Sequence, residues 1–382
     1  MRIGIEGQRL FRLEKHGMDI VAIEIIKQLQ QIDLENQYYL FIKDGEDDSW
    51  YTPTANFHLI RTKKAAYPIW EQIILPREVK KHKIDILHCT SNTAPVWLKI
   101  PLVLTLHDII YLENFKFVSF QSTLYQLVGN FYRRWVVPSN MRKAKRIITV
   151  SHSEKDIILE RYPKYTSKLV VVYNSISDNF LNIDKSKFPE FKARYKLPDE
   201  YIFTLGNSSP KKNFPNVLRA YIDYHKNTPN ALPLILADEP PSDTFKLVGV
   251  QIPEKVQKDI RFIGYVKNFE IPLLYAFSRL FIYASLRESF GIPILEGMAA
   301  GAPVITSNTS CMPEIAGDGA SLINPEKPEE ISAEISKIIN NSDYAKQLIK
   351  KGKERVGHFS WKNSAIQSLE IYTVLYSDIG NK

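Results

Sequence analysis

The stretch Tyr283-Ala-Ser-Leu-Arg-Glu-Ser-Phe-Gly-Ile-Pro-Ile-Leu-Glu-Gly-Met-Ala-Ala-Gly-Ala-Pro-Val-Ile305 predicts a strand that ends near its first residue, then a polar loop and a helix. Pro293 suits the first turn of that helix, and Gly301 suits a left-handed stop before the next strand. Gly291 lets a ligand approach the backbone closely, and the free N–H groups of residues 290–294 favour an anion. The stretch therefore predicts a ligand-binding strand–loop–helix unit of a parallel α/β sheet.

The same alternation of apolar runs and helical spacing extends over the whole chain, as in parallel sheets built from βαβ units. A first series of expected strands is Arg2–Glu6, Tyr38–Ile42, Phe57–Arg61, Ile86–His88, Leu102–Leu106, Ile147–Val150 and Leu169–Val172. A second series is Tyr201–Leu205, Leu234–Ala237, Ile260–Ile263, Leu280–Tyr283, Val304–Thr306 and Ala320–Ile323. Expected helices are Met18–Gln30, Phe214–Tyr224, Ile271–Ser278, Pro293–Ala300, Glu329–Asn340 and Lys362–Ser377.

We therefore expect two α/β domains, each a Rossmann-like, doubly wound parallel sheet, facing each other across a cleft. The first spans residues 1–178, and the second spans residues 200–360. Residues 179–199, with several charges and two prolines, form the expected linker. Residues 361–382 form a C-terminal helix that either stays with the second domain or crosses back to the first.

Length and composition exclude several classes of protein. A chain of 382 residues exceeds one domain of ~150 residues, and 44% hydrophobic with 24% charged residues is globular composition. The formal net charge of +8 mildly favours anionic partners, but no aromatic–basic motif supports nucleic acid as one of them. Cys89 and Cys311 form neither a disulfide framework nor a metal pair, so we expect a cytoplasmic protein. No export signal and no run of ~20 apolar residues is visible in the sequence.

Two pairs of charged residues, two glutamates and two lysines, lie near the predicted anion site. Glu288 and Glu296 lie on either side of the helix start, although a solvated loop charge and a favourable acid in the first helical turn would explain each residue singly. Upstream, Leu205-Gly-Asn-Ser-Ser-Pro-Lys-Lys-Asn places a glycine turn and then Lys211 and Lys212 after a strand. Lysines at such a junction suit a diphosphate, while an ordinary solvated pair is the alternative.

In the first half, His107 ends a buried strand and precedes Asp108. By its chemistry, His107 is a general base, a ligand of sugar hydroxyls or a core histidine whose hydrogen bonds are satisfied. Asp108 also suits a simple cap. Gly17, in His16-Gly17-Met18 before the first helix, is either a close-approach glycine or a plain turn residue.

The combination of these segments resembles closely the retaining nucleotide-sugar glycosyltransferases of family four, which have the two-domain GT-B fold. The resemblance implies that Glu288 meets the donor sugar hydroxyls and Glu296 the nucleotide ribose, and that His107 lies near the reacting sugar. His107 and Glu288 are thus the expected catalytic residues. The resemblance also implies that residues 1–178 form the acceptor-side domain and that residues 200–360 bind the donor nucleotide. The expected donor-binding residues are Gly17, Gly206, Lys211, Lys212, Glu288, Phe290, Gly291, Ile292 and Glu296. Two departures stand out, because many members have Arg where this chain has Asn207, and Gly where it has His16.

The resemblance implies a metal-independent hexosyltransferase that moves a sugar, with retention, from a nucleotide-diphosphate sugar to a hydroxyl of a glycan or lipid-linked acceptor. Bacterial surface polysaccharide synthesis is the expected setting. No cofactor is expected, since Gly-x-Gly-x-x-Gly, a phosphate loop with Gly-Lys-Ser/Thr, and Asp-x-Asp do not occur. A sugar-nucleotide isomerase (epimerase) on the same fold, and a non-catalytic sugar-nucleotide-binding protein, remain alternatives.

A basic, aromatic stretch in the first half leaves membrane contact open. Residues 125–135 mix aromatic side chains with Arg133 and Arg134, and four more cations follow by residue 146. Either this helix contacts anionic lipid weakly at the inner face of the membrane, or it packs its aromatic residues into the first domain.

Overall fold

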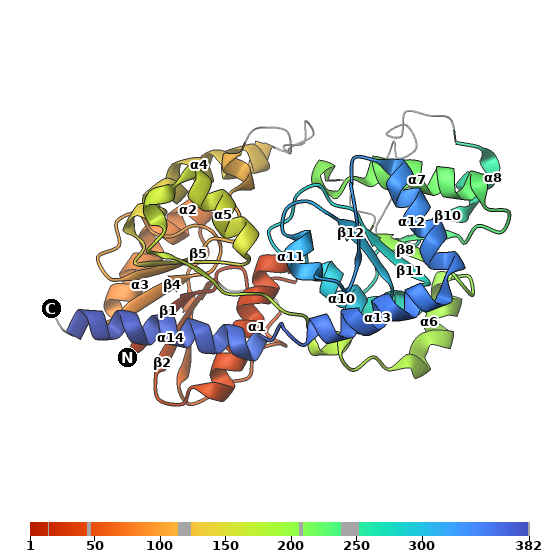
Figure 1. Ribbon diagram of the computed structural model, residues 1–382. Helices are drawn as coiled ribbons and strands as arrows, with labels where there is room; N and C mark the ends of the chain where they lie inside the picture. The colour runs from red at the N-terminus through yellow and green to blue at the C-terminus, as the bar shows by residue number, and fades with distance from the viewer. Residues whose placement is uncertain (14, 44–46, 114–123, 206–208, 238–251, 381–382) are drawn as a thin grey trace. The chain divides into compact units, whose positions relative to one another are not determined.

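The computed structural model describes all residues except 14, 44–46, 114–123, 206–208, 238–251 and 381–382 (Figure 1). The chain forms two compact units, and each is described by itself. The first unit combines Met1–Asn174 with the segment that begins at Ser360, and the second unit is Ser175–Phe359.

The first unit contains a seven-stranded sheet in the order β3-β2-β1-β4-β5-β6-β7, with every neighbouring pair parallel. Its strands are β1 (Arg2–Glu6), β2 (Gln37–Lys43), β3 (Phe57–Thr62), β4 (Ile86–Cys89), β5 (Leu102–Thr105), β6 (Arg146–Thr149) and β7 (Leu169–Val171). Its helices are α1 (Gly17–Ile32), α2 (Tyr67–Ile69), α3 (Leu75–Lys81), α4 (Leu124–Lys143), α5 (His152–Arg161) and α14 (Trp361–Gly380). A π-helical turn, Trp70–Ile74, joins α2 to α3.

The second unit contains a six-stranded parallel sheet in the order β10-β9-β8-β11-β12-β13. Its strands are β8 (Ile202–Leu205), β9 (Leu234–Ala237), β10 (Ile260–Phe262), β11 (Leu280–Tyr283), β12 (Val304–Ser307) and β13 (Ser321–Ile323). Its helices are α6 (Phe188–Tyr195), α7 (Phe214–Asn227), α8 (Glu254–Asp259), α9 (Ile271–Ala276), α10 (Ile292–Ala300), α11 (Met312–Ala316), α12 (Pro328–Asn340) and α13 (Ser342–Val356).

The predicted fold class, two doubly wound parallel α/β domains, is confirmed. Every expected strand lies within one residue of an observed strand at each end. In both sheets the strand order reverses once, between β1 and β4 in the first unit and between β8 and β11 in the second. At such a reversal the loops leave in opposite directions and open a crevice at the carboxyl ends of the strands, which is where ligands bind.

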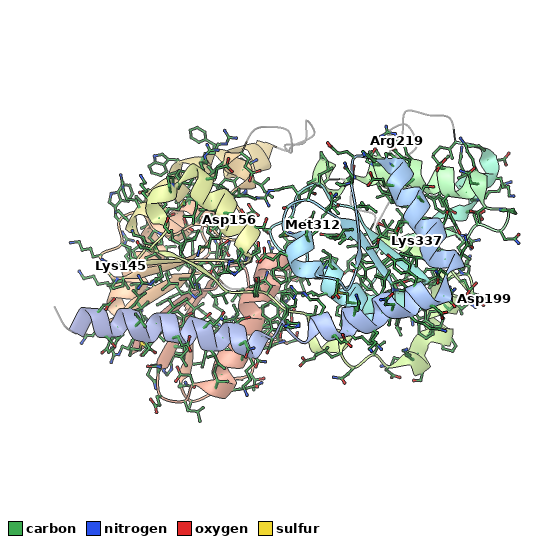
Figure 2. All side chains as sticks on the ribbon, in the orientation of Figure 1. Lys145, Asp156, Asp199, Arg219, Met312 and Lys337 are labelled. Atoms are coloured by element: carbon green, nitrogen blue, oxygen red, sulfur yellow. The ribbon has the colours of Figure 1, made fainter. Side chains whose placement is uncertain are left out.

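Apolar residues hold the sheets and helices together. In the first unit, alternate residues of the central strands supply two separate cores, as Phe41 of β2 packs with α3 and α4 residues while Leu40 and Ile42 pack with α1 and α14 residues. One large core in the second unit joins α7, α12 and the strands. Figure 2 shows side chains filling the space between sheet and helices in each unit.

The structure differs from the expected linker at residues 179–199. This segment contains α6, whose Phe191 is buried against Tyr195, with ring centroids 4.8 Å apart. Phe188 stacks on Phe277 at 3.4 Å, and Arg194 pairs with Glu270. The segment is thus part of the second unit. Of its two prolines, Pro189 occupies the first turn of α6, where proline is well tolerated, so it marks a helix start and not an unstructured connection.

The C-terminal helix belongs to the first unit. Helix α14 packs against α1 (Figure 1), and its residues Ala365 and Tyr372 are fully buried. The Tyr372 hydroxyl lies 2.6 Å from Nδ1 of His88 in β4, and the Ser364 hydroxyl donates to the Tyr173 carbonyl at 2.6 Å. Of the two alternatives for this helix, the structure shows packing on the first unit.

Candidate functional site

The predicted lysine and the first predicted glutamate meet at the reversal point of the second sheet. Lys212 lies in a 3₁₀ turn that shortly follows β8, and Glu288 lies in the loop after β11. The backbone N–H of Leu286 donates to the Lys211 carbonyl at 2.7 Å, which joins the two loops. Lys212 Nζ donates to Glu288 Oε1 and to the Tyr283 hydroxyl, both at 2.7 Å.

Charge and burial together set the ionisation of Glu288. Only 8% of this residue is exposed, and Lys211 Nζ lies 3.6 Å from its second oxygen. Burial by itself would raise the Glu288 pKa, but the ammonium groups of Lys212 and Lys211 outweigh it and bring the pKa below its ordinary value. The carboxylate is therefore ionised at neutral pH, with cations beside both oxygens.

Polar contacts fix the backbone of the Glu288 loop. The Ser310 hydroxyl donates to the Glu288 carbonyl at 2.6 Å, and Arg287 donates to the same oxygen at 2.6 Å. Ser310 has a φ of +56°, a conformation that L-residues adopt infrequently. Arg287 and Ser310 were not anticipated from the sequence, because their role depends on a contact between two loops.

The start of α10 has the expected backbone geometry. Gly291 caps the helix with a φ of +84°, and a Cβ there would approach Ile294 Cδ1 to 3.1 Å. A side chain would thus be strained at this position. Ile292 is the first helical residue, and the Phe290 ring is buried edge-on to Phe359, with centroids 5.7 Å apart. Because that ring packs into the unit, only the backbone of Phe290 is placed to meet a ligand.

Glu296 lies one turn into α10. Its Oε2 accepts a hydrogen bond from the hydroxyl of Tyr275 in α9 at 3.0 Å. The residue keeps some exposed surface, yet its carboxyl group is surrounded by protein, and burial raises its pKa to about 7. The two glutamates of this site therefore differ in ionisation. Sequence reasoning missed two tyrosines at the site, Tyr275, which donates to Glu296, and Tyr283, whose hydroxyl accepts from Lys212.

His107 follows β5 in the first unit and is 5% exposed. Its Nε2 lies 2.9 Å from the Thr90 carbonyl, and its backbone N–H donates to Asn92 Oδ1 at 2.7 Å. A carbonyl only accepts, so Nε2 carries the proton and Nδ1 is the basic nitrogen of the neutral ring. Burial lowers the His107 pKa, which favours this neutral form.

The two predicted glycines have different outcomes. Gly17 is the first residue of α1, and a Cβ there would meet no atom within 4 Å. The packing of the first unit therefore does not require glycine at this position. Gly206, like the departure at Asn207, lies outside the described residues.

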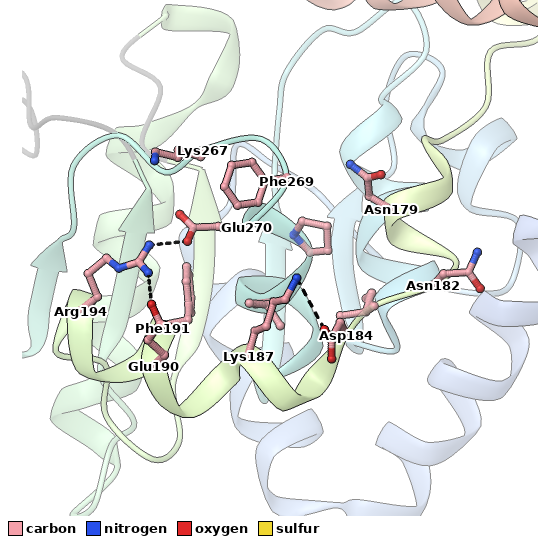
Figure 3. Close-up of a pocket in the computed structure, with 13 residues that line it drawn as sticks. Asn179, Asn182, Asp184, Lys187, Glu190, Phe191, Arg194, Lys267, Phe269 and Glu270 are labelled. Atoms are coloured by element: carbon pink, nitrogen blue, oxygen red, sulfur yellow. Dashed lines mark hydrogen bonds and ion pairs between the residues drawn. The ribbon is translucent and has the colours of Figure 1, made fainter. Parts of the chain in front are cut away.

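A large cavity in the second unit contains none of these predicted side chains. It has a volume of about 490 Å³ and lies between α6 and the start of α9 (Figure 3). Its charged groups mostly satisfy one another, as Arg194 pairs with Glu190 and Glu270, and Lys187 pairs with Asp184. We therefore place the candidate site at the β8–β11 reversal and not in this cavity.

Two further observations concern the described residues as a whole. No helix among them combines the length and the apolar character needed to cross a membrane. Within the same residues, His, Cys, Asp and Glu side chains do not gather in a group of three or more that could hold a metal ion.

Comparison with known proteins matches both units to family models. Residues 16–180 match the model described as Glycosyltransferase Family 4, and residues 187–355 match Glycosyl transferases group 1. The O-antigen chain mannosyltransferase B of Escherichia coli is 29% identical over 62% of this chain and 62% of its own length. The O-antigen chain mannosyltransferase RfbU of Salmonella typhimurium is 26% identical over 66% of this chain and 64% of its own length. The chain thus spans less than two thirds of these relatives.

Solved structures share the fold over nearly the whole chain. Sucrose-phosphate synthase from Thermosynechococcus elongatus superposes with a TM-score of 0.73 and 16% identity, covering 99% of both chains. Anabaena Alr3699/HepE, in complex with UDP and glucose, gives a TM-score of 0.73 with 18% identity over 98% of this chain and 100% of its own.

Proposed function

Because the chain belongs to the family 4-type glycosyltransferases, we propose that it transfers a sugar from a nucleotide-diphosphate sugar to a hydroxyl of a glycan or lipid-linked acceptor. The proposal includes retention at the anomeric carbon and a role in bacterial surface polysaccharide synthesis. The relatives named as O-antigen chain mannosyltransferases support that setting and make mannose the first sugar to test. The solved neighbour that holds UDP and glucose supports a nucleotide-sugar donor.

The observation that carries the proposal is the contact of Lys212 with Glu288 at the end of two adjacent strands. In the proposed roles, Lys212 binds the donor diphosphate and stabilises the charge that develops on the leaving group, with Lys211 as the weaker contact. In the same proposal the backbone N–H of Ile292 faces that anion, since Pro293 has no N–H and the N–H of Ile294 donates to the Gly291 carbonyl at 3.0 Å. Protein cations and backbone dipoles then supply the charge that a metal ion supplies in other transferases, so we propose metal independence.

Glu288 binds the donor sugar in this proposal and does not attack it. Both of its oxygens lie beside lysine ammonium groups, and a carboxylate held by cations is a weak nucleophile. Retention then follows if the acceptor attacks the sugar face that the diphosphate leaves, with a leaving oxygen accepting the acceptor proton. Glu296 accepts hydrogen bonds from the ribose, and His107 acts near the reacting sugar.

A thermal-shift screen of nucleotide sugars is the first test, because a donor at 100 times its dissociation constant stabilises the protein by about 2.7 kcal/mol. The donor that shifts the midpoint is then incubated with acceptors, and the anomeric configuration of the product is read by NMR. Lys212→Met should lose transfer, while Lys255→Met, at an exposed position of α8, should keep it. An altered donor sugar without any acceptor indicates an isomerase, and intact donor with every acceptor indicates a binding protein.

We also propose weak peripheral attachment to anionic membranes through α4. Phe131 and Trp135 lie one helical turn apart and are 77% and 58% exposed, whereas Val136 and Val137 are buried. Exposed cations, Arg142 and Lys145, follow. These aromatic residues therefore do not pack into the unit, which supports lipid contact over the packing alternative. Vesicle sedimentation should show binding to anionic but not neutral vesicles, and Phe131→Ser should weaken it; equal binding to both would contradict the proposal.

A further inference from the structure

A second polar pocket lies at the reversal point of the first sheet, between β1 and β4. It has a volume of about 110 Å³ and is lined by side chains that include Arg9, Tyr67, Asn92, Asp108, Tyr111 and Arg133. A water occupies about 30 Å³, so this space holds a group about as large as four waters. A phosphate group fits this volume, and a nucleotide does not.

Two arginines give the pocket its charge. Arg9 lies over the Tyr67 ring, 5.3 Å from its centroid, and Arg133 lies over the Tyr111 ring at 5.8 Å. Within the described part of the chain, neither guanidinium forms an ion pair with a carboxylate; Arg133 donates to the Asn130 side chain at 3.0 Å. Asp108 is the single acid among the lining residues, so the pocket carries a net positive charge.

One residue that lines the pocket has a buried hydroxyl without a partner among the described residues. Tyr111 is 8% exposed, and its hydroxyl forms no hydrogen bond with any residue that the structure describes. Buried hydroxyls are normally paired, because an unpaired one has lost its water without compensation. The hydroxyl oxygen itself has almost no accessible surface, so a ligand in the pocket pairs with it only when the Tyr111 side chain turns toward the pocket.

A buried carboxyl group holds one wall of the pocket in place. Glu71, in the π-helical turn, is fully buried, and it accepts hydrogen bonds from the hydroxyls of Tyr67, at 2.8 Å, and Tyr132. Gln72 donates to it at 2.9 Å. These bonds fix the Tyr67 ring on which Arg9 rests, so the arginine is positioned before any ligand arrives.

We propose that this pocket binds a phosphate group of the acceptor, with Arg9 and Arg133 as cationic contacts. The Tyr111 hydroxyl becomes a hydrogen-bond donor to the phosphate when its side chain turns toward the ligand. Guanidinium groups suit phosphate because their planar donors match its oxygens. Asp108 and Asn92, on the same wall, accept hydrogen bonds from hydroxyls next to the phosphate. The assignment of the ligand as acceptor rests on the proposed glycosyltransferase function, whereas the binding of phosphate does not.

The test is calorimetric titration of the full chain with inorganic phosphate. Arg9→Gln and Arg133→Gln should each weaken binding at least about tenfold, as expected for a lost charge-assisted hydrogen bond. Arg77→Gln, at an exposed position of α3, is the matched control and should bind like the wild type. Lys212→Ala separates the pocket from the donor site and should keep this binding.

Tyr111→Phe distinguishes a ligand role from a structural one. Because the hydroxyl has no partner in the described structure, its removal should leave the unfolding midpoint unchanged or raise it, yet weaken phosphate binding by about tenfold. A lower midpoint with unchanged binding would overturn the assignment. The assignment would also be overturned if only Lys212→Ala lost phosphate binding, or if the wild type showed no saturable binding up to about 10 mM phosphate.

Two arms identify the source of the phosphate. One measures binding of mannose 6-phosphate, and the other measures sedimentation with phosphatidylcholine vesicles that contain a polyprenyl phosphate. If Arg133→Gln weakens binding of mannose 6-phosphate, the pocket takes a soluble acceptor; if it weakens sedimentation with the vesicles, the pocket takes a lipid-linked acceptor. If the variant changes neither, the proposal is wrong. If phosphate binds as expected but no sugar is transferred to any acceptor, the proposed function fails while the pocket assignment stands.

Discussion

Replacing Lys212 by methionine should expose how far Glu288 depends on its cation. The methionine stem keeps most of the packing on the Tyr283 ring, 4.8 Å below the ammonium group, and removes the charge. Breaking a buried ion pair by removal of one partner costs about 3–5 kcal/mol. Lys211 remains 3.6 Å away and Lys212 is 18% exposed, so we expect a loss of about 2–3 kcal/mol at neutral pH.

The loss should depend on pH in a definite direction. In the wild type, the Glu288 pKa is lowered, so ionised Glu288 stabilises the fold above its unfolded-state pKa, and this contribution disappears as the pH falls through the folded-state pKa. Without Lys212, burial dominates and raises the folded-state pKa, so the variant loses stability as the pH rises above about 4.3. The difference between the two proteins should therefore grow from pH 4 to pH 7 and be small at the acid end.

The chain offers an internal control for this experiment. All five tryptophans, at positions 50, 70, 97, 135 and 361, lie in the first unit. Tryptophan fluorescence in urea should report an unchanged transition, while far-UV circular dichroism should show earlier unfolding of the second unit. The double variant Lys212→Met/Glu288→Gln should recover most of the loss, because no buried charge remains. An equal loss at pH 4 and pH 7, or no recovery in the double variant, would refute the ion-pair explanation.

Three further predictions concern ligand binding and turnover. His107→Ala should lower kcat strongly and leave the affinity for the nucleoside diphosphate unchanged in calorimetry, because the other unit binds that ligand. Unchanged turnover would mean that His107 is a structural residue of the core. Lys212→Ala should weaken the binding of a nucleoside diphosphate about ten- to a hundredfold and the binding of the bare nucleoside only slightly. An equal effect on both ligands would show that Lys212 does not contact the diphosphate. Burial raises the pKa of Glu296 to about 7, so this carboxyl group is partly protonated at neutral pH, and ribose hydroxyls that donate to it should release protons on nucleotide binding. Calorimetry in two buffers of different ionisation enthalpy measures that release, and Glu296→Gln should abolish it; release that persists in the variant assigns the proton to another group.

Local sequence patterns predicted the elements because each pattern depends on near neighbours. The strand Leu280–Tyr283 and the start and stop of α10 follow from apolar runs, a proline and a glycine close in the chain. Helix α6 is not predicted because several charges and two prolines are also typical of a linker, although Phe188, Phe191 and Tyr195 have the spacing of a helical face.

The contacts of the candidate site depend on residues far apart in the chain. Lys212 and Glu288 are 76 residues apart, and they meet because β8 pairs with β11, a neighbour relation that no local pattern encodes. The same holds for Tyr275, whose hydroxyl faces Glu296, and for Tyr111, whose unpaired hydroxyl emerges only from packing. Sequence reasoning therefore found the charged residues of the donor site but not the tyrosines that accompany them.

The packing of α14 against α1 has a consequence for the synthesis of the protein. The ribosome makes the strands of the first unit early, at about 5–20 residues per second, yet Ala365, Tyr372 and Leu375 complete one of its cores. The second unit, contained in one continuous segment, is therefore free to fold while the first still exposes the apolar surface that α14 will cover. At that rate the surface stays exposed for roughly 15–70 seconds after α1 is made, and premature termination before residue 361 would leave it permanently uncovered.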